Sequence, residues 1–454
     1  MDKLYQWMDA HADELIEAAG RLVRINSVGG TPENGHPFGD GVAAALDEAL
    51  AIAQNWGLAT HNHEYYVGTA QLGEGEPRLG VLCHLDTVPL GVGWTHDPLG
   101  AEIDDGKMYG RGTTDDKGPA AATLFALRAL KECGMTPPAA CRVVLGGDEE
   151  TGSTDMEYYQ TKEAFPPYLF SPDGSYPLIN TEKGRVQLTV TAPMTDPRLL
   201  WARGGVALNA VPTEATACLC GVETQAVQEA AARAGHTVTV AETAEGMTVT
   251  AHGAAAHGST PEKGENAVTA LLEVLAVLGV GGAAVKNASE KFPFAEYGGE
   301  SAGAACSDAP SGALTLAFTC LSIEGGQFVG KADIRFPVTF TVADIEGKLH
   351  AGLDAAFTVT FANCVEGHHV PEDSPFVQTL LNVYAEETGE EAHGLAIGGG
   401  TYVHGIPNGV AFGVEFPGVD NRIHGADEFI GVDELLMDAR LIARAVAAVC
   451  AENW

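Results

Sequence analysis

The sequence has 454 residues, of which 45% are apolar and 19% are charged. A chain of this length exceeds what a single hydrophobic core holds, and the composition is not that of a disordered chain, so we expect two globular domains. Its 25 Lys and Arg residues against 61 Asp and Glu residues leave a net charge of −36, which repels phosphate backbones and anionic lipid surfaces. The charge therefore argues against nucleic acid and membranes as partners, whereas a field of this sign concentrates cations.

The N-terminal residues 1–25 are predicted to form an amphipathic helix rather than a signal peptide, because no basic start precedes an apolar core and a cleavage site. Apolar residues recur near helical spacing at Leu4, Trp7, Met8, Leu15, Leu22 and Val23. No apolar run in the chain reaches the length of about 20 residues that a membrane span needs. The nine cysteines lack the spacing of a disulfide framework or of a structural zinc site, so we expect reduced thiols and a cytoplasmic protein.

The first part of the chain has the pattern of an α/β sheet. Apolar runs of strand length at 79–83 and 141–145 each lead into polar residues, which places chemistry at strand ends. Between these runs, residues 119–133 favour a helix that Gly134 ends.

From about residue 186 the pattern changes to segments of alternating apolar and polar residues, such as 186–190 and 247–251, and one clear helix is predicted at 266–278. A helical pattern begins again near Ser374, and strand-like runs return at 410–416. We therefore predict an α+β domain at 186–366 inserted into an α/β domain built from 1–185 and 367–454.

The run His84-Leu85-Asp86 follows the apolar strand at 79–83. If the strand continues through it, the histidine and the aspartate point to the same face. Such a pair supplies a metal ligand together with the carboxylate that orients its ring. Taken alone, the run is a weak signal, and a surface histidine beside an acid explains it better than a metal site.

Two further segments carry adjacent acids. Asp115 and Asp116 end a glycine-rich loop directly before the helix at 119, where they are either metal ligands or N-terminal acids favoured by the helix dipole. Glu149 and Glu150 follow the apolar run at 141–145, where one can bind metal while its neighbour handles a proton, or both form a solvated turn. Asp173 and His424 are unremarkable alone, but together these clusters match the carboxyl-end ligand sites of α/β sheets.

The segments HLDTVP, YGRGTTDDKG, GGDEETG, SPDGSYP and NRIHGADE, in this order, resemble the co-catalytic metallopeptidases of the aminoacylase and carboxypeptidase family. Within it they are most similar to the bacterial dipeptidases of the PepV and Sapep type. The resemblance implies a zinc-peptidase-like catalytic domain, with a mixed sheet flanked by helices, and an inserted ferredoxin-like α+β lid.

The resemblance also implies roles for individual residues. Two divalent ions, Zn²⁺ or Mn²⁺ with Co²⁺ as an alternative, would be held by a bridging carboxylate and two ligands each. The bridge would be Asp115, with a cis Asp115-Asp116 peptide; the first ion would add His84 and Asp173, and the second Glu150 and His424. Glu149 would be the general base, and Asp86 would orient His84.

In the inserted domain, the segment around His257 is similar to the family segment whose histidine reaches the substrate carbonyl. Asn209 and Arg335 match substrate-contacting positions, and Gly400 and Thr401 belong to a backbone-rich loop expected to meet the substrate's C-terminal carboxylate. The implied function is metal-dependent hydrolysis of dipeptides with a free N-terminus. The alternatives are an amidohydrolase that removes an acyl group from an amino acid and a metal-binding protein without activity. The resemblance favours a monomer over a homodimer, because the lid of this type replaces a partner subunit.

Overall fold

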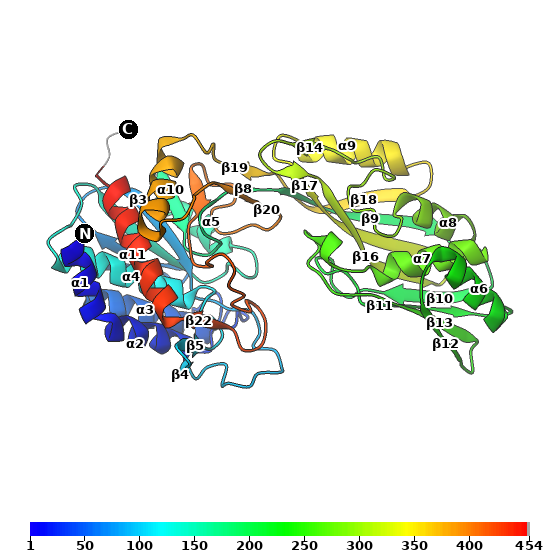
Figure 1. Ribbon diagram of the computed structural model, residues 1–454, viewed down its shortest axis with the longest axis horizontal. Coiled ribbons are helices and arrows are strands. Elements are labelled where there is room, and N and C mark those ends of the chain that lie inside the picture. The colour runs from blue at the N-terminus through cyan, green and yellow to red at the C-terminus, as the bar shows by residue number, and fades with distance from the viewer. Residues whose placement is uncertain (452–454) are drawn as a thin grey trace. The chain divides into compact units, whose positions relative to one another are not determined.

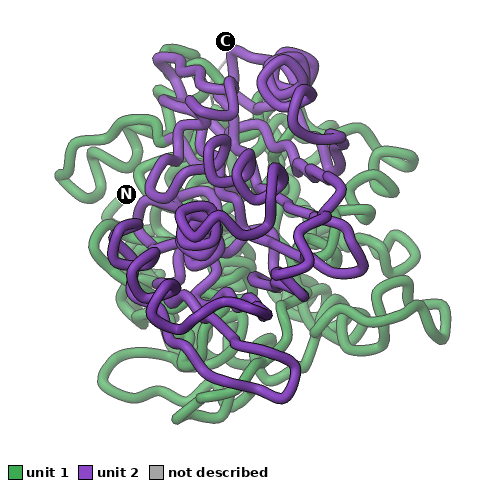
Figure 2. Tube along the Cα trace, turned by 90° about the vertical axis from the view of Figure 1, so that its right-hand side faces the viewer, with its two compact units in different colours: residues 1–180, 370–395, 400–454 green, residues 181–369, 396–399 purple. Residues whose placement is uncertain are grey.

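The computed structural model describes residues 1–451, which divide into two compact units. The first unit consists of residues 1–180, 370–395 and the chain from 400 onward; the second consists of residues 181–369 and 396–399. Figure 2 shows the first in green and the second in purple. Compared with the predicted borders near 185 and 366, the second unit begins earlier, ends later and takes in 396–399.

The first unit is built on a mixed sheet with the strand order β1-β2-β6-β3-β7-β21-β8. Strands β6, β3, β7 and β21 are parallel to one another, whereas β1, β2 and β8 pair antiparallel with their neighbours. The bounds are β1 Ala59–His63, β2 Val67–Leu72, β3 Pro77–His84, β6 Ala140–Gly146, β7 Tyr168–Ser171, β8 Ile179–Glu182 and β21 Gly409–Ala411. The predicted α/β class with a mixed sheet is confirmed.

Helices cover the sheet, and α4 (Lys117–Glu132) packs against both α2 (Ala12–Val23) and α11 (Val432–Val449) (Figure 1). Alternate side chains of the parallel strands enter different cores: Val81 joins the core with these helices, and Leu82 joins a smaller core with Tyr402. Both faces are therefore buried, which explains why the central strands read as continuous apolar runs. The remaining helices of this unit are α1 Asp2–Ala10, α3 Asp40–Asn55, α5 Thr154–Gln160 and α10 Pro375–Thr388.

The predicted first helix is in fact two helices, α1 and α2, and the prediction of one continuous helix was wrong. The break falls at His11, whose backbone (φ −119°, ψ 15°) leaves the helical region. The His11 ring stacks on Trp7, and its Nδ1 lies 2.7 Å from the Trp7 carbonyl oxygen. This contact satisfies a carbonyl that the end of α1 leaves without a helical partner.

A small antiparallel sheet of β4 (Glu102–Asp104), β5 (Lys107–Tyr109) and β22 (Phe429–Gly431) also belongs to the first unit. It joins the segment before the predicted Asp115 to the segment after the predicted His424. Two predicted metal ligands that are far apart in the sequence thus lie on loops of one local structure.

The second unit has an eight-stranded antiparallel sheet of order β12-β13-β11-β10-β16-β17-β9-β18, more strands than a single ferredoxin-like unit contains. Its bounds are β9 Gly184–Pro193, β10 Leu199–Gly204, β11 Glu214–Leu219, β12 Val238–Glu242, β13 Met247–His252, β16 Thr315–Glu324, β17 Gln327–Phe336 and β18 Thr358–Val365. The predicted helix at 266–278 is α7 (Ala267–Leu278), which Asn266 caps by accepting hydrogen bonds from Val268 N–H and Thr269 N–H. With α6 (Thr224–Ala234), α8 (Gly282–Lys291) and α9 (Val342–Leu353), it forms this unit's own core against the sheet.

Short elements complete the described chain: β14 Ser307–Asp308, β15 Gly312–Ala313, β19 His368–His369, β20 Leu395–Ile397 and the 3-10 helix Pro261–Lys263. Within residues 1–451, no helix combines the length and the apolar character needed to cross a membrane. All nine cysteines are free thiols.

Candidate metal centre

The acidic and histidine side chains of the first unit converge at one edge of its sheet. His84 is the last residue of β3, Glu149 and Glu150 follow β6, and Asp173 follows β7. These three strands are parallel, so their carboxyl ends meet at the same edge, which is where α/β sheets place their ligands.

Their ligand atoms form two groups, and the atoms within each lie within 4.8 Å of one another. The first group is His84, Glu149 and Asp173; the second is Asp115, Glu150 and His424. Asp115 links them, because its Oδ1 lies 2.8 Å from His84 Nε2 and its Oδ2 lies 2.8 Å from His424 Nε2. The structure thus brings together every residue predicted to bind metal, and it adds the predicted base Glu149 to the first group.

Asp115 stands directly before α4, and the Asp115-Asp116 peptide bond is cis, as the resemblance implied. The carboxylate of Asp116 accepts a hydrogen bond from the backbone N–H of His84 (3.0 Å). The two adjacent aspartates thus act on the side chain and on the backbone of the same histidine.

Asp86 is a buried residue that contacts the first ligand group through the ring of His84. Its Oδ1 lies 3.4 Å from His84 Nδ1, and its two carboxylate oxygens accept hydrogen bonds from the backbone N–H groups of Glu149 (3.2 Å) and Glu150 (3.1 Å). The carbonyl oxygen of Asp86 also lies 3.1 Å from His84 Nδ1. Asp86 therefore fixes the position of the His84 ring relative to the loop that carries Glu149 and Glu150.

The cluster concentrates negative charge away from water. Burial, reinforced by the neighbouring Asp115, raises the pKa of Asp173 to about 7 and raises that of Glu149 well above its usual range. The neighbouring carboxylates of Asp115 and Glu150 raise the pKa of His424 to about 10. Groups that hold protons this tightly in a crowded carboxylate cluster form a set that divalent cations can neutralise instead.

The donor set fits two metal ions. Each group offers one imidazole nitrogen and two carboxylates, a mixture that suits zinc and manganese. In the second group, Glu150 Oε1 is buried and accepts no hydrogen bond from the described residues, although it lies 3.3 Å from His424 Nε2. A buried carboxylate oxygen without a hydrogen bond is costly unless an ion takes that place.

The predicted substrate residues Asn209, His257 and Arg335 lie in the second unit, where Gly258, next to His257, is close to both Asn209 and Asp333, the ion-pair partner of Arg335. The Asn209 carbonyl accepts a hydrogen bond from Gly258 N–H (2.7 Å), next to His257. Arg335 donates to the Gly398 carbonyl, and its Nε and Nη2 lie 3.0 and 2.9 Å from Asp333 Oδ2.

Residues 80–448 match the sequence model of the family described as "Peptidase family M20/M25/M40", a span that contains every predicted site residue. The chain belongs to this family. It is thus a metal-dependent peptidase with a two-metal centre, and the resemblance found in its motifs is confirmed.

Individual relatives of this M20 peptidase extend over its whole length. It is 34% identical to YtjP of Bacillus subtilis (strain 168) over 460 residues, 96% of each chain. It is 32% identical to the Beta-Ala-Xaa dipeptidase of Lactobacillus delbrueckii subsp. lactis over 458 residues, again 96% of each. Among solved structures, human carnosine dipeptidase 1 shares the fold, with a TM-score of 0.63 and 18% identity over 99% of this chain and 98% of that one.

Gly400 and Thr401 belong to the first unit of the M20 peptidase, not to the second unit with the other predicted substrate residues. The segment that follows them packs Tyr402 and Val403 into the smaller core of the first unit. The Thr401 carbonyl accepts a hydrogen bond from His404 N–H (2.9 Å). The backbone near the predicted carboxylate loop is thereby anchored to the sheet that carries the predicted metal ligands.

The structure also identifies positioning residues that the sequence reading missed. Asp155 accepts hydrogen bonds from Gly147 N–H (2.7 Å), Asp148 N–H (3.1 Å) and the Tyr402 hydroxyl, so it fixes the start of the loop that carries the glutamates. A signal was present, because an aspartate shortly after GGDEETG stands where a helix begins.

Arg111 and Glu428 were also not predicted from the sequence. They form a buried ion pair between the two loops of the second ligand group. Glu428 Oε1 accepts hydrogen bonds from the backbone N–H groups of Gly112 (3.0 Å) and Thr114 (3.1 Å). Arg111 Nη2 donates to the carbonyl of Gly425 (3.0 Å), the neighbour of His424. The pair therefore ties the Asp115 loop to the His424 loop.

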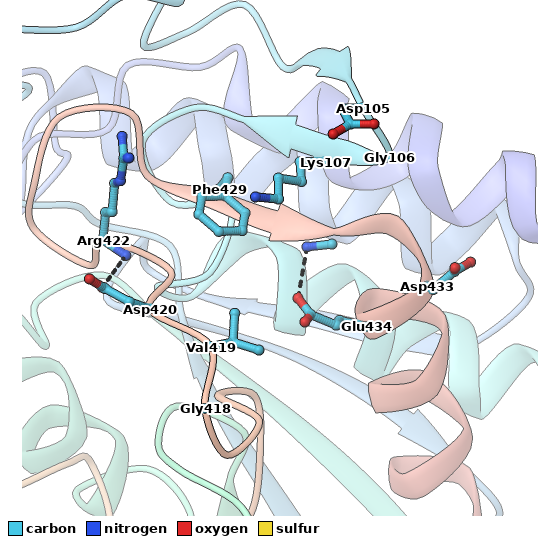
Figure 3. Close-up of a pocket in the computed structure, with 11 residues that line it drawn as sticks. Asp105, Gly106, Lys107, Gly418, Val419, Asp420, Arg422, Phe429, Asp433 and Glu434 are labelled. Carbon is cyan, nitrogen blue, oxygen red and sulfur yellow. Dashed lines mark hydrogen bonds between the residues drawn. The ribbon is translucent and has the colours of Figure 1, made fainter.

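The His424 loop also borders a cavity of about 670 Å³ in the first unit (Figure 3). In this view the Lys107 ammonium lies over the Phe429 ring, 4.1 Å from its centre, and Glu434 accepts the hydrogen bond from Gly431 N–H. The residues that line this cavity do not include the predicted metal ligands. This hollow is therefore separate from the convergent carboxylates.

Proposed function

We propose that this M20 peptidase cleaves the peptide bond of dipeptides that carry a free N-terminus. The observation that carries the proposal is the pair of ligand groups linked by Asp115, with Glu149 beside them. The Lactobacillus relative, which matches along nearly its whole length, is named a Beta-Ala-Xaa dipeptidase, and this name supports the same substrate class.

The proposed ligands are His84 and Asp173 for the first ion, Glu150 and His424 for the second, and Asp115 for both. Zinc or manganese is the proposed metal, with cobalt as a further candidate, because imidazole and carboxylate donors suit all three. When bound, two such ions lower the pKa of a shared water and polarise the carbonyl oxygen of the scissile bond.

Glu149 is the proposed general base. It accepts a proton from the attacking water and passes it to the leaving amine. Its place supports this role, since its backbone N–H is held by Asp86 while its side chain joins the first ligand group. Asp86 acts on the chemistry by fixing the ring of His84.

The second unit is the proposed lid domain, with residues 186–366 as its predicted extent. His257 is its proposed donor to the oxyanion. Ser259 N–H donates to His257 Nδ1 (3.2 Å), which makes that nitrogen the acceptor and leaves the ring proton on Nε2. Asn209 and Arg335 are proposed to contact the substrate, with Gly400 and Thr401 meeting its C-terminal carboxylate. The proposed working form is a cytoplasmic monomer, consistent with nine free thiols.

A substrate panel tests the proposal. The purified enzyme, assayed with its metal content measured, is expected to cleave dipeptides such as β-Ala-Leu and Ala-Leu and to leave their N-acetylated forms intact. Activity confined to N-acetyl and N-succinyl amino acids would replace the dipeptidase with the acyl-removing amidohydrolase. A protein that binds two ions but cleaves neither class would have lost its activity.

A further inference from the structure

Two arginines face each other on the sheet of the second unit. Arg185 on β9 and Arg335 on β17 are direct partners in the antiparallel register. Side chains in such positions stand on the same face with their Cβ atoms roughly 5 Å apart, and like charges there destabilise the sheet. A negative charge close to both arginines would therefore stabilise this pairing.

The protein supplies only half of that compensation. Nε and Nη2 of Arg335 both contact Asp333 Oδ2, and Nη1 donates to the Gly398 carbonyl. Asp333 is buried and offers one negative charge, whereas the two guanidinium groups carry two positive charges. One positive charge stays uncompensated at this place.

That charge belongs to Arg185. Within residues 1–451 its guanidinium makes no ion pair and no hydrogen bond, and its Nε is shielded from water without a partner. Burial, followed by the neighbouring Arg335, lowers the pKa of Arg185. An arginine stays charged even so, and in a chain with a net charge of −36 an unpaired, half-buried guanidinium is unexpected.

The pair is next to the proposed substrate residues of the same unit. Thr315 is the register partner of Arg335 on its other side, and its hydroxyl donates to the Ser259 carbonyl (3.5 Å), beyond His257. Ser259 also lies close to Gly398, since a Cβ placed on that glycine would meet the Ser259 Cβ at 2.5 Å. Arg185 therefore extends the existing cluster by one residue.

We propose that Arg185 and Arg335 together receive a C-terminal substrate residue that carries two carboxylates, as aspartate and glutamate do. Arg335, held by Asp333, takes the main-chain carboxylate, and Arg185 takes the side-chain carboxylate with its uncommitted N–H groups. Guanidinium groups bind carboxylates through two parallel hydrogen bonds, which gives this choice its specificity. The inference rests on the proposed dipeptidase function and specifies the preferred substrates as dipeptides with a C-terminal aspartate or glutamate.

The test compares matched acidic and neutral substrates. kcat/KM is measured for Ala-Glu against Ala-Gln and for Ala-Asp against Ala-Asn, with the wild type, Arg185→Gln, Arg185→Lys and the control Arg203→Gln. Arg203 lies on β10 of the same sheet and stacks on Trp201, so its variant makes the same change of charge away from the pair.

The wild type is expected to prefer the acidic member of each pair. Arg185→Gln should reduce this preference about 10- to 100-fold, mainly through KM, because a charge-assisted hydrogen bond is lost. Arg185→Lys should keep part of the preference, and Arg203→Gln all of it. Because Arg185 has no partner to lose, Arg185→Gln should melt no lower than the wild type.

A preference that is absent in the wild type, or equal in Arg185→Gln and the wild type, overturns the inference while the dipeptidase function stands. If no dipeptide is cleaved, the proposed function fails, and calorimetric titration with glutarate and butyrate decides the arginine pair separately. Tighter binding of glutarate by the wild type than by Arg185→Gln supports the pair; equal or undetectable binding rejects it.

Discussion

Asp86 shows how one buried side chain sets the geometry of several others. Its carboxylate touches the His84 ring and receives the backbone N–H groups of Glu149 and Glu150. Reaction rates fall steeply when a catalytic group is displaced. A shared anchor for the proposed ligand His84 and the proposed base Glu149 would therefore favour catalysis. The sequence predicted only its contact with His84, because the glutamates reach Asp86 through backbone atoms.

Removing the charge of Glu149 tests its role at the residue scale. Glu149→Gln is expected to lower kcat by about 10²- to 10⁴-fold, because the amide cannot accept the proton. Metal content should be retained, since the other ligands are unchanged and the amide still offers an oxygen. Stopped assays give kcat, and elemental analysis of the purified variant gives the metal content.

The control is Glu157→Gln, which makes the same change at an exposed position of α5. It should behave as the wild type in both measurements. Near-normal turnover in Glu149→Gln would remove Glu149 from the mechanism, and loss of metal would make it a ligand first.

Asp438, on α11, belongs to neither ligand group and gives a pH-dependent prediction. It is fully buried against the Tyr176 hydroxyl (2.7 Å), and burial raises its pKa to about 7. The folded state therefore keeps a proton that the unfolded state releases near pH 4, so stability is lost as the pH rises from about 4 to about 7. The loss is on the order of a few kcal/mol, at about 1.4 kcal/mol for each pKa unit.

Asp438→Asn removes this titration and should gain stability relative to the wild type between pH 5 and pH 8. Urea denaturation at both pH values measures the difference, with the exposed Asp433→Asn on the same helix as the control for net charge. A difference between wild type and Asp438→Asn that is the same at both pH values would contradict the buried titration.

At the scale of elements, the strands that lead to the site were predictable because their physics is local. The runs at 79–83 and 141–145 are buried on both faces and read as continuous apolar segments, and each leads into predicted site residues. The glycine and proline stops around α4 and the Asn266 cap of α7 are likewise local signals.

Contacts between distant segments were not predictable in this way. Arg111 and Glu428 lie 317 positions apart in the sequence, and no sequence pattern at either residue predicts the other as its partner. Arg185 and Arg335 meet only through the register of β9 and β17, which no single strand pattern contains. The break between α1 and α2 at His11 depends on one backbone conformation and a ring contact. The helical periodicity of apolar residues does not reveal either feature.

The Arg111–Glu428 pair leads to a prediction about loops. Glu428→Gln leaves Arg111 buried without its counter-ion and weakens the acceptor of the N–H groups of Gly112 and Thr114. The second ligand group, on the loops that this pair joins, should lose metal affinity by about 10- to 100-fold, as is typical for partners behind the ligands. Metal titration should then show one tight and one weakened site.

Glu434→Gln is the matched control, because Glu434 caps α11 just after the same loop by accepting the Gly431 N–H (3.0 Å). It should leave both metal affinities unchanged. Equal weakening of both sites in Glu428→Gln, or no weakening, would show that the pair does not act on the second group.

At the scale of the whole molecule, each unit has its own hydrophobic core. The helices around α4 close the first core, and α7 closes the second against the antiparallel sheet. Units of this kind unfold as separate cooperative blocks unless they share a large interface. All the proposed metal ligands belong to the first unit, so the ions are linked to the folding of that unit alone.

Metal removal is therefore expected to affect only one of two thermal transitions. At a hundredfold excess of metal over Kd, one site stabilises the folded state by about 2.7 kcal/mol, and this contribution disappears on chelation. Calorimetry with EDTA should show one transition moving down while the other stays in place, and added zinc or manganese should restore both the transition and the activity. Leu271→Ala, in the buried core of the second unit, identifies the other transition, because a cavity there costs about 2 to 5 kcal/mol. If chelation moved the transition that Leu271→Ala lowers, the two units would fold as one block and the metal ions would stabilise the entire chain.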